Sequence, residues 1–323
     1  MRVLITGGGG FIGRKLARSL LDSGLDDQPI DAITLFDTVP AEGLPPDPRI
    51  DMVTGDITSP SDVARAAAGA DLIWHLAAVV SAAAEADFDL GYRVNVDGTR
   101  ILLEALRGSD RRTRMVFASG FAVFGGDMPD VITDDFHPTP QSSYGTQKAI
   151  GELLVADYSR KGFVDGRSLR LPTIVVRPGK PNKAASTFAS SIIREPLAGQ
   201  EAVCPVERDT AIYILSPRRV VDSLRRAMRL PDDAWGSNRT LPLPGITATV
   251  GEMVDALHRT AGPAVTDRIV WRPDPAIQRI VASWPVRAEA RRARDLGFTD
   301  DGSFDAILAA HIEDELGGTI PAG

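Results

Sequence analysis

Cysteine is almost absent from this chain. Cys204 is the single cysteine among 323 residues, so an intrachain disulfide is excluded and a zinc site built on cysteines is not expected. We expect no metal site of this kind. A chain with so few thiols fits a reducing compartment, and we expect a cytoplasmic location.

Long hydrophobic runs and an excess of basic charge are also missing. No stretch approaches the ~20 consecutive apolar residues of a transmembrane helix, and the first residues lack the pattern of a secretory signal. The chain has 36 Lys and Arg against 43 Asp and Glu, a formal net charge of −7. A non-specific nucleic-acid binder needs clustered positive charge, so neither a membrane nor a nucleic acid is expected as a partner.

The first half of the chain alternates short apolar runs with segments of helical periodicity, which is typical of βαβ units. Strands are expected at Val3–Thr6, Ala32–Phe36, Met52–Thr54, Leu72–Leu76, Arg114–Ser119 and Arg167–Leu171. Helices are expected at Phe11–Leu21, Ser59–Ala68, Arg93–Leu106 and Tyr144–Tyr158. Because the strands are uniformly apolar, both faces should be covered by helices. We predict an α/β fold with a Rossmann-type doubly wound parallel sheet.

The pattern changes after Pro178, where prolines recur and the alternation becomes irregular. We expect the sheet domain to span residues 1–178 and a smaller C-terminal substrate-binding lobe to span residues 179–323, with some segments returning to the first domain. Open α/β sheets bind ligands at their carboxyl edge, and this lobe should build on that edge. Helices are expected there at Ser216–Met228 and Thr249–Thr260.

A glycine-rich turn follows the first expected strand and opens the first helix. It reads Gly7-x-x-Gly10-x-x-Gly13, with Phe11 and Ile12 inside the pattern. Glycines there allow a tight turn, a close approach of the backbone to a pyrophosphate and close packing of helix on strand. The alternative is a flexible glycine loop, but the position between strand and helix favours a dinucleotide site.

Acidic residues close the second and third expected strands. Asp37 lies 24 residues past Gly13, where a carboxylate accepts hydrogen bonds from the adenosine ribose and repels a 2′-phosphate. This favours NAD over NADP, and we interpret the neighbouring Arg14 as a solvated helix residue. Asp56 and Ile57 follow the third strand; the acid could contact the adenine, and a plain aspartate turn is the alternative.

Tyr144-Gly-Thr-Gln-Lys148 places a phenol and an ammonium one helical turn apart on one face. A tyrosine of ordinary pKa about 10 is a poor base at neutral pH. A lysine ammonium at ~4 Å stabilises a phenolate by about 4 kcal/mol at an effective dielectric of ~20. Tyr144 could then take a proton from an alcohol, with Lys148 also holding the nicotinamide ribose. The alternative is an exposed helix pair.

These motifs together resemble the extended short-chain dehydrogenases/reductases, the NAD-dependent epimerase/dehydratase family. Further matching segments are His75–Ala78, Asn95–Thr99, Ala122–Gly125 and Arg170–Pro172. The resemblance implies that cofactor contacts come from Leu76, Ala77, Ala78, Asn95 and Pro172. It also implies that Asn95 orients a water or lysine relay, and that His75 is a packed structural residue. It implies a homodimer formed through the helices Val94–Leu106 and Ala149–Tyr158.

One position departs from the family pattern. The family usually places Ser or Thr five residues before the glycine of its Val-Tyr/Phe-Gly turn, where the hydroxyl polarises the substrate oxygen; here that position is Gly120. Ser119 precedes it, and successive strand residues point to opposite faces, so Ser119 can substitute only where the strand ends or bulges. Ser119 is the predicted catalytic hydroxyl, and Ser81 and Thr173 are the alternatives.

The segment Arg170–Asn182, followed by Ile193–Gly199, is similar to the D-erythronate dehydrogenases within this family. That resemblance implies oxidation of the C2 hydroxyl of a small sugar acid to a 2-oxo acid with NAD. A small anionic substrate needs a cation, and Lys180, Lys183 and Arg194 lie on this segment. The predicted substrate contacts are Ser81, Ser119, Tyr144, Thr173, Asn182 and Arg194.

Two other functions stay open at this point. A nucleotide-sugar epimerase/dehydratase would retain its NAD and needs an aromatic platform and arginines, to which Tyr213, Arg218 and Trp235 could contribute. A non-catalytic NAD(H)-binding sensor could keep the fold while Gly120 removes catalysis.

The substitution Tyr144→Phe tests the assigned base. We expect turnover to fall by about 10²–10⁴-fold, the typical contribution of an acid/base group, while NAD affinity changes little. Steady-state kinetics and a fluorescence titration with NAD measure the two quantities. A variant that keeps the full rate would show that another group is the base.

Overall fold

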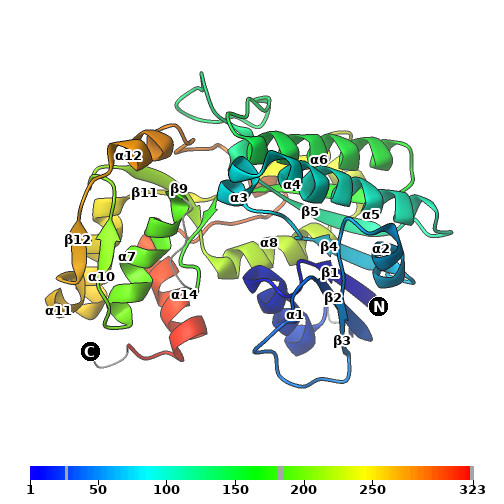
Figure 1. Ribbon diagram of the computed structural model, residues 1–323, viewed down its shortest axis with the longest axis horizontal. Coiled ribbons are helices and arrows are strands. Elements are labelled where there is room, and N and C mark those ends of the chain that lie inside the picture. Colours follow the sequence, from blue (N-terminus) through cyan, green and yellow to red (C-terminus); the bar gives the residue numbers. More distant parts are fainter. Residues whose placement is uncertain (26–27, 180–184, 321–323) are drawn as a thin grey trace. The chain divides into compact units, whose positions relative to one another are not determined.

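The computed structural model describes residues 1–25, 28–179 and 185–320 of the chain, which divides into two compact units (Figure 1). The first unit comprises residues 1–123, 140–170 and 221–241. The second comprises residues 124–139, 171–220 and 242–323. No helix among the described residues is long and apolar enough to cross a membrane.

A seven-stranded sheet forms the centre of the first unit. Its strand order is β10-β6-β5-β4-β1-β2-β3, and β1 pairs in parallel with β2 and β4, as do β2 with β3 and β4 with β5. The strands are β1 (Arg2–Thr6), β2 (Ala32–Asp37), β3 (Ile50–Thr54), β4 (Leu72–His75), β5 (Arg114–Gly120), β6 (Asp165–Leu171) and β10 (Thr240–Pro242). The order reverses at β1, which confirms the predicted Rossmann-type sheet.

Helices cover both faces of this sheet (Figure 1). Ile73 packs into a core with residues of α2 (Pro60–Ala67), α5 (Gly98–Arg107) and α6 (Ser143–Arg160). The next strand residue, Trp74, points to the other face, where its indole N–H donates to the carbonyl of Leu224 at 3.0 Å. Leu224 belongs to α8 (Pro217–Arg229), which is held beside α1 (Phe11–Ser23) by hydrogen bonds from Arg225 to the Ser19 and Gly24 carbonyls.

The helix predicted over Arg93–Leu106 is present, and its first part is a π-helix. After the short helices α3 (Ser81–Ala86) and α4 (Phe88–Gly91), residues Tyr92–Asp97 form the π-helix η1, and α5 begins only at Gly98. Close contacts flank this wider turn, because a Cβ at Gly91 would lie 2.5 Å from Nε2 of Gln147. The predicted helix is therefore confirmed, while its π-helical turn, which lies beside a helix far along the chain, was not predicted.

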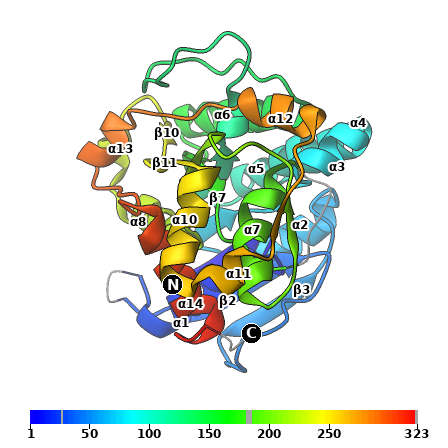
Figure 2. The same cartoon turned by 90° about the vertical axis from the view of Figure 1, so that its left-hand side faces the viewer.

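The second unit is built from short strands and helices around its own core. Strands β7 (Thr173–Ile174), β9 (Ala211–Leu215) and β11 (Ile246–Thr249) form one sheet, and β8 (Ala202–Cys204) pairs with β12 (Ile269–Trp271). Helix α10 (Val250–Ala261) packs against α7 (Phe188–Leu197) and α14 (Phe304–Leu316) (Figure 2). The remaining helical segments are η3 (Ala185–Thr187), α11 (Pro263–Thr266), α12 (Pro275–Ala282) and α13 (Arg291–Asp295) in this unit, and η2 (Phe121–Val123) and α9 (Asp232–Trp235) in the first.

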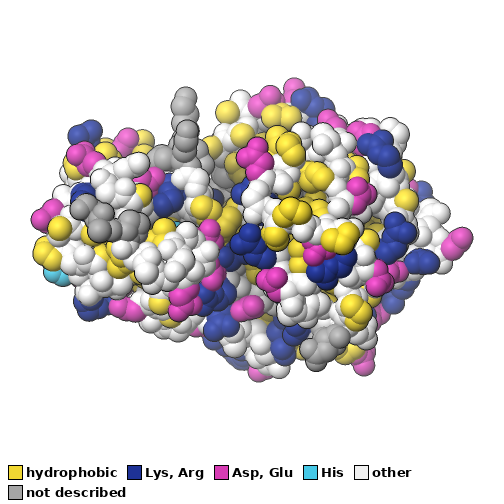
Figure 3. Space-filling model, turned by 90° about the horizontal axis from the view of Figure 1, so that it is seen from below, with side chains coloured by type: hydrophobic (Ala, Val, Ile, Leu, Met, Phe, Trp, Pro, Cys, Tyr) yellow, Lys and Arg dark blue, Asp and Glu magenta, His cyan; other side chains and the backbone are white. Residues whose placement is uncertain are grey.

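Basic and acidic side chains are interspersed over the face of the molecule shown in Figure 3. Exposed ion pairs such as Arg259–Asp305, at 2.8 Å, are screened by water and salt. Each contributes at most about 1 kcal/mol to the free energy of unfolding. Exposed pairs of this kind therefore contribute little to stability, compared with the buried cores and buried charges.

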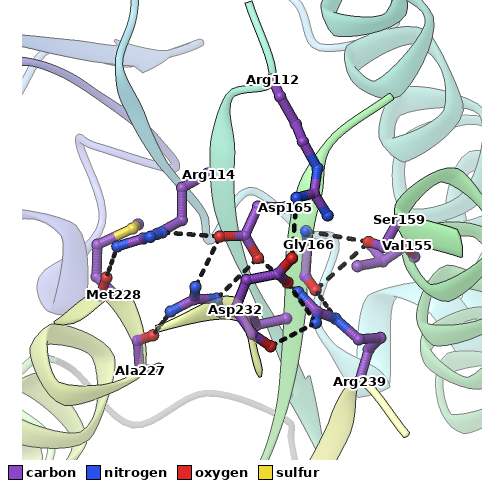
Figure 4. A network of polar contacts seen from close by, with 11 residues as sticks. Arg112, Arg114, Val155, Ser159, Asp165, Gly166, Ala227, Met228, Asp232 and Arg239 are labelled. Atoms are coloured by element: carbon purple, nitrogen blue, oxygen red, sulfur yellow. Dashed lines mark hydrogen bonds and ion pairs between the residues drawn. The ribbon is translucent and has the colours of Figure 1, made fainter. Parts of the chain in front are cut away.

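Asp165, at the start of β6, is the centre of a buried ionic network in the first unit (Figure 4). Its carboxylate accepts hydrogen bonds from Nε of Arg114 at 2.9 Å, from Nη2 of Arg167 at 2.7 Å, and from Nη2 of Arg239. Arg167 is fully buried, and Asp165 is 5% exposed. This carboxylate therefore pairs with three guanidinium groups, and Arg239 has the Asp232 carboxylate as a second partner at 2.7 Å.

The same arginines hold the end of helix α8 against the sheet. Arg114 donates to the Met228 carbonyl at 2.8 Å, and Arg167 donates to the Ala227 carbonyl. Cations are favourable at a helix C-terminus, where carbonyl groups lack partners within the helix. The network thus fixes residues 221–241, which return to the first unit late in the sequence.

Substitution of Asp165 by Asn should lower the free energy of unfolding by about 3 kcal/mol or more, because buried guanidinium groups lose their counter-charge. Urea denaturation followed by circular dichroism measures this change. The control is Asp157→Asn, since Asp157 pairs with Arg160 on the exposed surface of α6. The control should change stability by less than about 0.5 kcal/mol. Equal effects of the two substitutions would contradict the role of the network.

Candidate active site

The glycine loop lies between β1 and α1 and is shaped by contacts that no side chain would permit. Gly7 has φ +72° and donates to the Phe36 carbonyl at 2.9 Å. A Cβ at Gly13 would lie 2.4 Å from the Gly7 carbonyl oxygen. Gly10 is the N-cap of α1, and no side chain caps this helix end. The residues present therefore fit a pyrophosphate, because backbone N–H groups and the positive end of the helix dipole face it without a competing side chain.

Asp37 ends β2 against this loop. Its Oδ2 accepts from the Gly9 N–H at 3.0 Å, and its Oδ1 accepts from the Thr38 N–H at 2.7 Å. Arg14 donates to the Gly9 carbonyl at 3.1 Å, so its guanidinium is held by the loop backbone. The Asp37 carboxylate thus lies beside the glycine loop at the start of α1.

Asp56 and Ile57 follow β3. Oδ1 of Asp56 accepts from the Thr58 N–H at 2.8 Å, which is the aspartate turn that the sequence left as an alternative. Ile57 is buried in the core and packs against Gly98.

The segment after β4 lies directly against the glycine loop. A Cβ at Gly7 would lie 2.7 Å from the Ala77 nitrogen and 2.8 Å from the Leu76 carbonyl carbon. Farther along, the Val79 N–H donates to Oδ1 of Asn95 at 2.9 Å, and Nδ2 of Asn95 donates back to the Val79 carbonyl at 3.0 Å. Asn95 therefore fixes the loop that contains Leu76–Ala78.

Asn95 is also joined to the helix that carries the tyrosine and the lysine. Its Nδ2 donates to Oε1 of Gln147 at 2.7 Å. Both residues are buried. The described contacts of the Asn95 amide are thus with Val79 and Gln147, and they connect η1, the loop after β4 and α6.

His75 forms a directional chain of hydrogen bonds. The Thr99 hydroxyl donates to the Asn95 carbonyl at 2.7 Å, so Nε2 of His75 is assigned as the donor to Thr99 at 2.9 Å. Nδ1 then accepts from the Thr6 hydroxyl at 2.7 Å. Burial lowers the pKa of His75 to about 3, and the nearby Lys148 charge acts in the same direction. His75 is neutral and its two ring nitrogens both have partners.

Helix α6 brings Tyr144 and Lys148 together. The Ser142 hydroxyl caps the helix by accepting from the Gly145 N–H at 3.1 Å. The Lys148 Nζ lies 5.6 Å from the centre of the Tyr144 ring and donates to the Ala118 carbonyl at 2.8 Å. Burial lowers the pKa of Lys148 to about 8, while the Glu152 charge acts to raise it. The ammonium form therefore still predominates at neutral pH.

Ser119 is buried, and its hydroxyl donates to Oε1 of Glu152 at 2.5 Å. In this arrangement the hydroxyl proton is directed to Glu152, and the donor role of Ser119 toward the substrate stays a prediction. Glu152 is a residue that the sequence reasoning missed. Its spacing, one helical turn after Lys148, was the available signal.

The other predicted substrate contacts lie apart in the chain. Ser81 begins α3 in the first unit and is exposed, whereas Thr173 and Arg194 belong to the second unit. Pro172, a predicted cofactor contact, also belongs to the second unit. Within that unit Arg194 donates to the Arg177 carbonyl and to Glu195. The predicted residues Asn182, Lys180 and Lys183 lie outside the described residues.

The chain is similar to known proteins along most of its length. A model described as the NAD dependent epimerase/dehydratase family matches residues 3–214. The chain is 53% identical to D-erythronate dehydrogenase from Cupriavidus necator, over 97% of this chain and 98% of the relative. It is 44% identical to D-erythronate dehydrogenase from Haemophilus influenzae, over 98% and 100%. A solved nucleoside-diphosphate-sugar epimerase from Agrobacterium tumefaciens is 46% identical with a TM-score of 0.95, over 99% and 96%.

The substitution Asp37→Ser should lower the preference for NAD over NADP about 10-fold or more, since charge-assisted hydrogen bonds contribute about 1.5–3 kcal/mol each. Fluorescence titration with both cofactors measures the two dissociation constants. Asp51→Ser, an exposed position on β3, is the control and should leave the preference unchanged. An unaltered preference in Asp37→Ser would remove Asp37 from the ribose site.

Proposed function

Because the chain belongs to the NAD dependent epimerase/dehydratase family, we propose that it is an NAD-dependent dehydrogenase that oxidises the C2 hydroxyl of D-erythronate to a 2-oxo acid. The observation that carries the proposal is the 53% and 44% identity, over nearly the whole chain, to two D-erythronate dehydrogenases. The arrangement of Tyr144 and Lys148 supports it, because oxidation of an alcohol requires a group that removes its proton.

The first unit supplies the groups that would hold NAD. Backbone N–H groups of Gly7–Gly13 would bind the pyrophosphate, Asp37 the adenosine ribose, and Asp56 and Ile57 the adenine side. Leu76–Ala78, Asn95 and Lys148 would hold the nicotinamide half. The family resemblance implies a further contact from Pro172, which belongs to the second unit. NAD, when bound, supplies the acceptor for the hydride that leaves the substrate carbon.

Tyr144 would take the proton of the substrate hydroxyl, and the Lys148 ammonium would stabilise the resulting phenolate. Gly120 brings no hydroxyl to the end of β5, so Ser81 or Thr173 would supply the polarising hydrogen bond. Arg194 and Asn182 are the proposed partners of the substrate carboxylate.

We further propose a homodimer formed through the helices Val94–Leu106 and Ala149–Tyr158. Leu153 supports this, because 71% of it is exposed on α6 within the second of these segments. Light scattering at working concentration should give twice the 34.5 kDa mass of the chain, and Leu153→Glu should shift the protein toward the monomer. A monomeric mass for the unmodified protein would contradict the dimer.

A cytoplasmic location also remains a prediction from the sequence.

The function is tested by the absorbance of reduced nicotinamide after mixing the protein with NAD or NADP and a panel of D- and L-tetronates, threonine and a nucleotide sugar. We expect rapid NADH formation with D-erythronate and little with the L-isomers. Tightly bound NAD on purification without net NADH release would favour the epimerase, the activity for which the Agrobacterium protein is named. NAD binding without turnover of any compound would favour a sensor.

A further inference from the structure

We propose that Ser119 and Glu152 form a positioning pair that holds the Lys148 ammonium in place beside Tyr144, and that Ser119 does not act on the substrate. The proposal rests on the dehydrogenase function proposed above. It assigns a role to a buried carboxylate that the reaction itself does not use.

Two contacts join α6 to the end of β5. The Lys148 Nζ donates to the Ala118 carbonyl at 2.8 Å, and the Ser119 hydroxyl donates to Glu152 at 2.5 Å. Lys148 and Glu152 are one helical turn apart, and their two partners are adjacent on the strand. A pair of such contacts fixes both the rotation of the helix about its axis and its position along the strand.

Between these two contacts, helix α6 packs tightly against the Phe117 side chain of β5. Gly151 lies between Lys148 and Glu152 on the helix, and a Cβ there would lie 2.6 Å from the Phe117 ring. The Lys148 Nζ itself lies 4.7 Å from the centre of that ring. The position of the Lys148 ammonium therefore depends on its hydrogen bond to the Ala118 carbonyl and on the hydrogen bond between Ser119 and Glu152.

Arg170 of β6 holds the carboxylate from the other side. Its Nε donates to Oε1 of Glu152 at 2.9 Å and its Nη2 donates to Oε2 at 2.7 Å. This two-point contact keeps Glu152 from turning toward Lys148, so its charge acts on the ammonium through space. Glu152 is 4% exposed and Arg170 is 7% exposed, and water screens this interaction weakly.

The charged groups around Lys148 determine the direction in which loss of the Glu152 charge moves its titration. Glu152 on its own helix is negative, Arg170 on β6 is positive, and His75 on β4 is neutral. Removal of the Glu152 charge would leave two buried cations without a counter-charge and would disfavour the ammonium form of Lys148. The reaction would then lose the group that stabilises the Tyr144 phenolate as pH rises.

The decisive experiment compares Glu152→Gln, Ser119→Ala and Ser119→Thr in the full-length protein, with Asp157→Asn on the exposed face of α6 as the control. NMR of protein labelled with ¹⁵N-lysine follows the titration of Lys148, whose signal is identified by its loss in Lys148→Met. The pH profile of kcat with D-erythronate and the NAD dissociation constant are measured in parallel.

We expect Glu152→Gln to move the Lys148 titration and the alkaline limb of kcat down by about one pH unit, with NAD affinity within threefold of the unmodified protein. Ser119→Ala should lower kcat by less than about tenfold and should also move the alkaline limb of kcat to lower pH. Ser119→Thr should restore kcat and the position of this limb, because threonine keeps the hydroxyl. The control should match the unmodified protein.

A Lys148 titration that stays unchanged in Glu152→Gln would overturn the proposal. So would a fall of about 10²–10³-fold in Ser119→Ala with an unmoved pH profile, which is the result expected for a group that polarises the substrate oxygen directly. If Glu152→Gln fails to fold, the two Ser119 variants decide alone. If the unmodified protein does not oxidise D-erythronate, the proposed function fails, while the NMR titration still tests the positioning pair.

Discussion

Helix α6 approaches the end of strand β5 more closely than any side chain would allow, and the groups of the candidate site depend on this approach. A Cβ at Gly145 would lie 2.0 Å from the Ala122 carbonyl oxygen, and one at Gly151 would meet Phe117. At this separation the side chains of Lys148 and Glu152 form hydrogen bonds with Ala118 and Ser119 of the strand. Tyr144 is positioned because the helix that carries it has little freedom to slide or roll.

The parallel sheet brings the remaining groups to the same edge. β1, β2 and β4 are neighbours that run in one direction, so the glycine loop, Asp37 and the segment Leu76–Ala78 all follow carboxyl ends of strands. Asn95 then joins the last of these segments to α6 through Gln147. The segment after β4 and the helix that carries Tyr144 and Lys148 are thus connected by one buried amide pair. Asn95 lies in a π-helix whose wider turn the local sequence does not reveal.

Sequence reasoning succeeded where the relevant physics is local. Glycine spacing predicts a tight turn, an acid at a strand end predicts a carboxylate at the sheet edge, and a spacing of four predicts one helix face. It could not predict the partners of Ser119 or Asn95, because a side-chain direction depends on what packs against it. Likewise, Asp165 gave no signal as the centre of a network, since Arg239 approaches it from a distant part of the sequence. The π-helix was missed for the same reason.

The return of residues 221–241 to the first unit has a consequence for synthesis of the chain. A ribosome that has made β1 through β6 has produced Trp74 and Asp165, but not the Leu224 carbonyl or the Arg239 guanidinium that complete their surroundings. Until those residues emerge, one face of the sheet carries an uncovered indole, and Asp165 lacks one of its guanidinium partners. The nascent sheet therefore cannot close before residues 171–220 of the second unit have been made, and a fragment cut after Pro178 would expose apolar surface that the full chain buries.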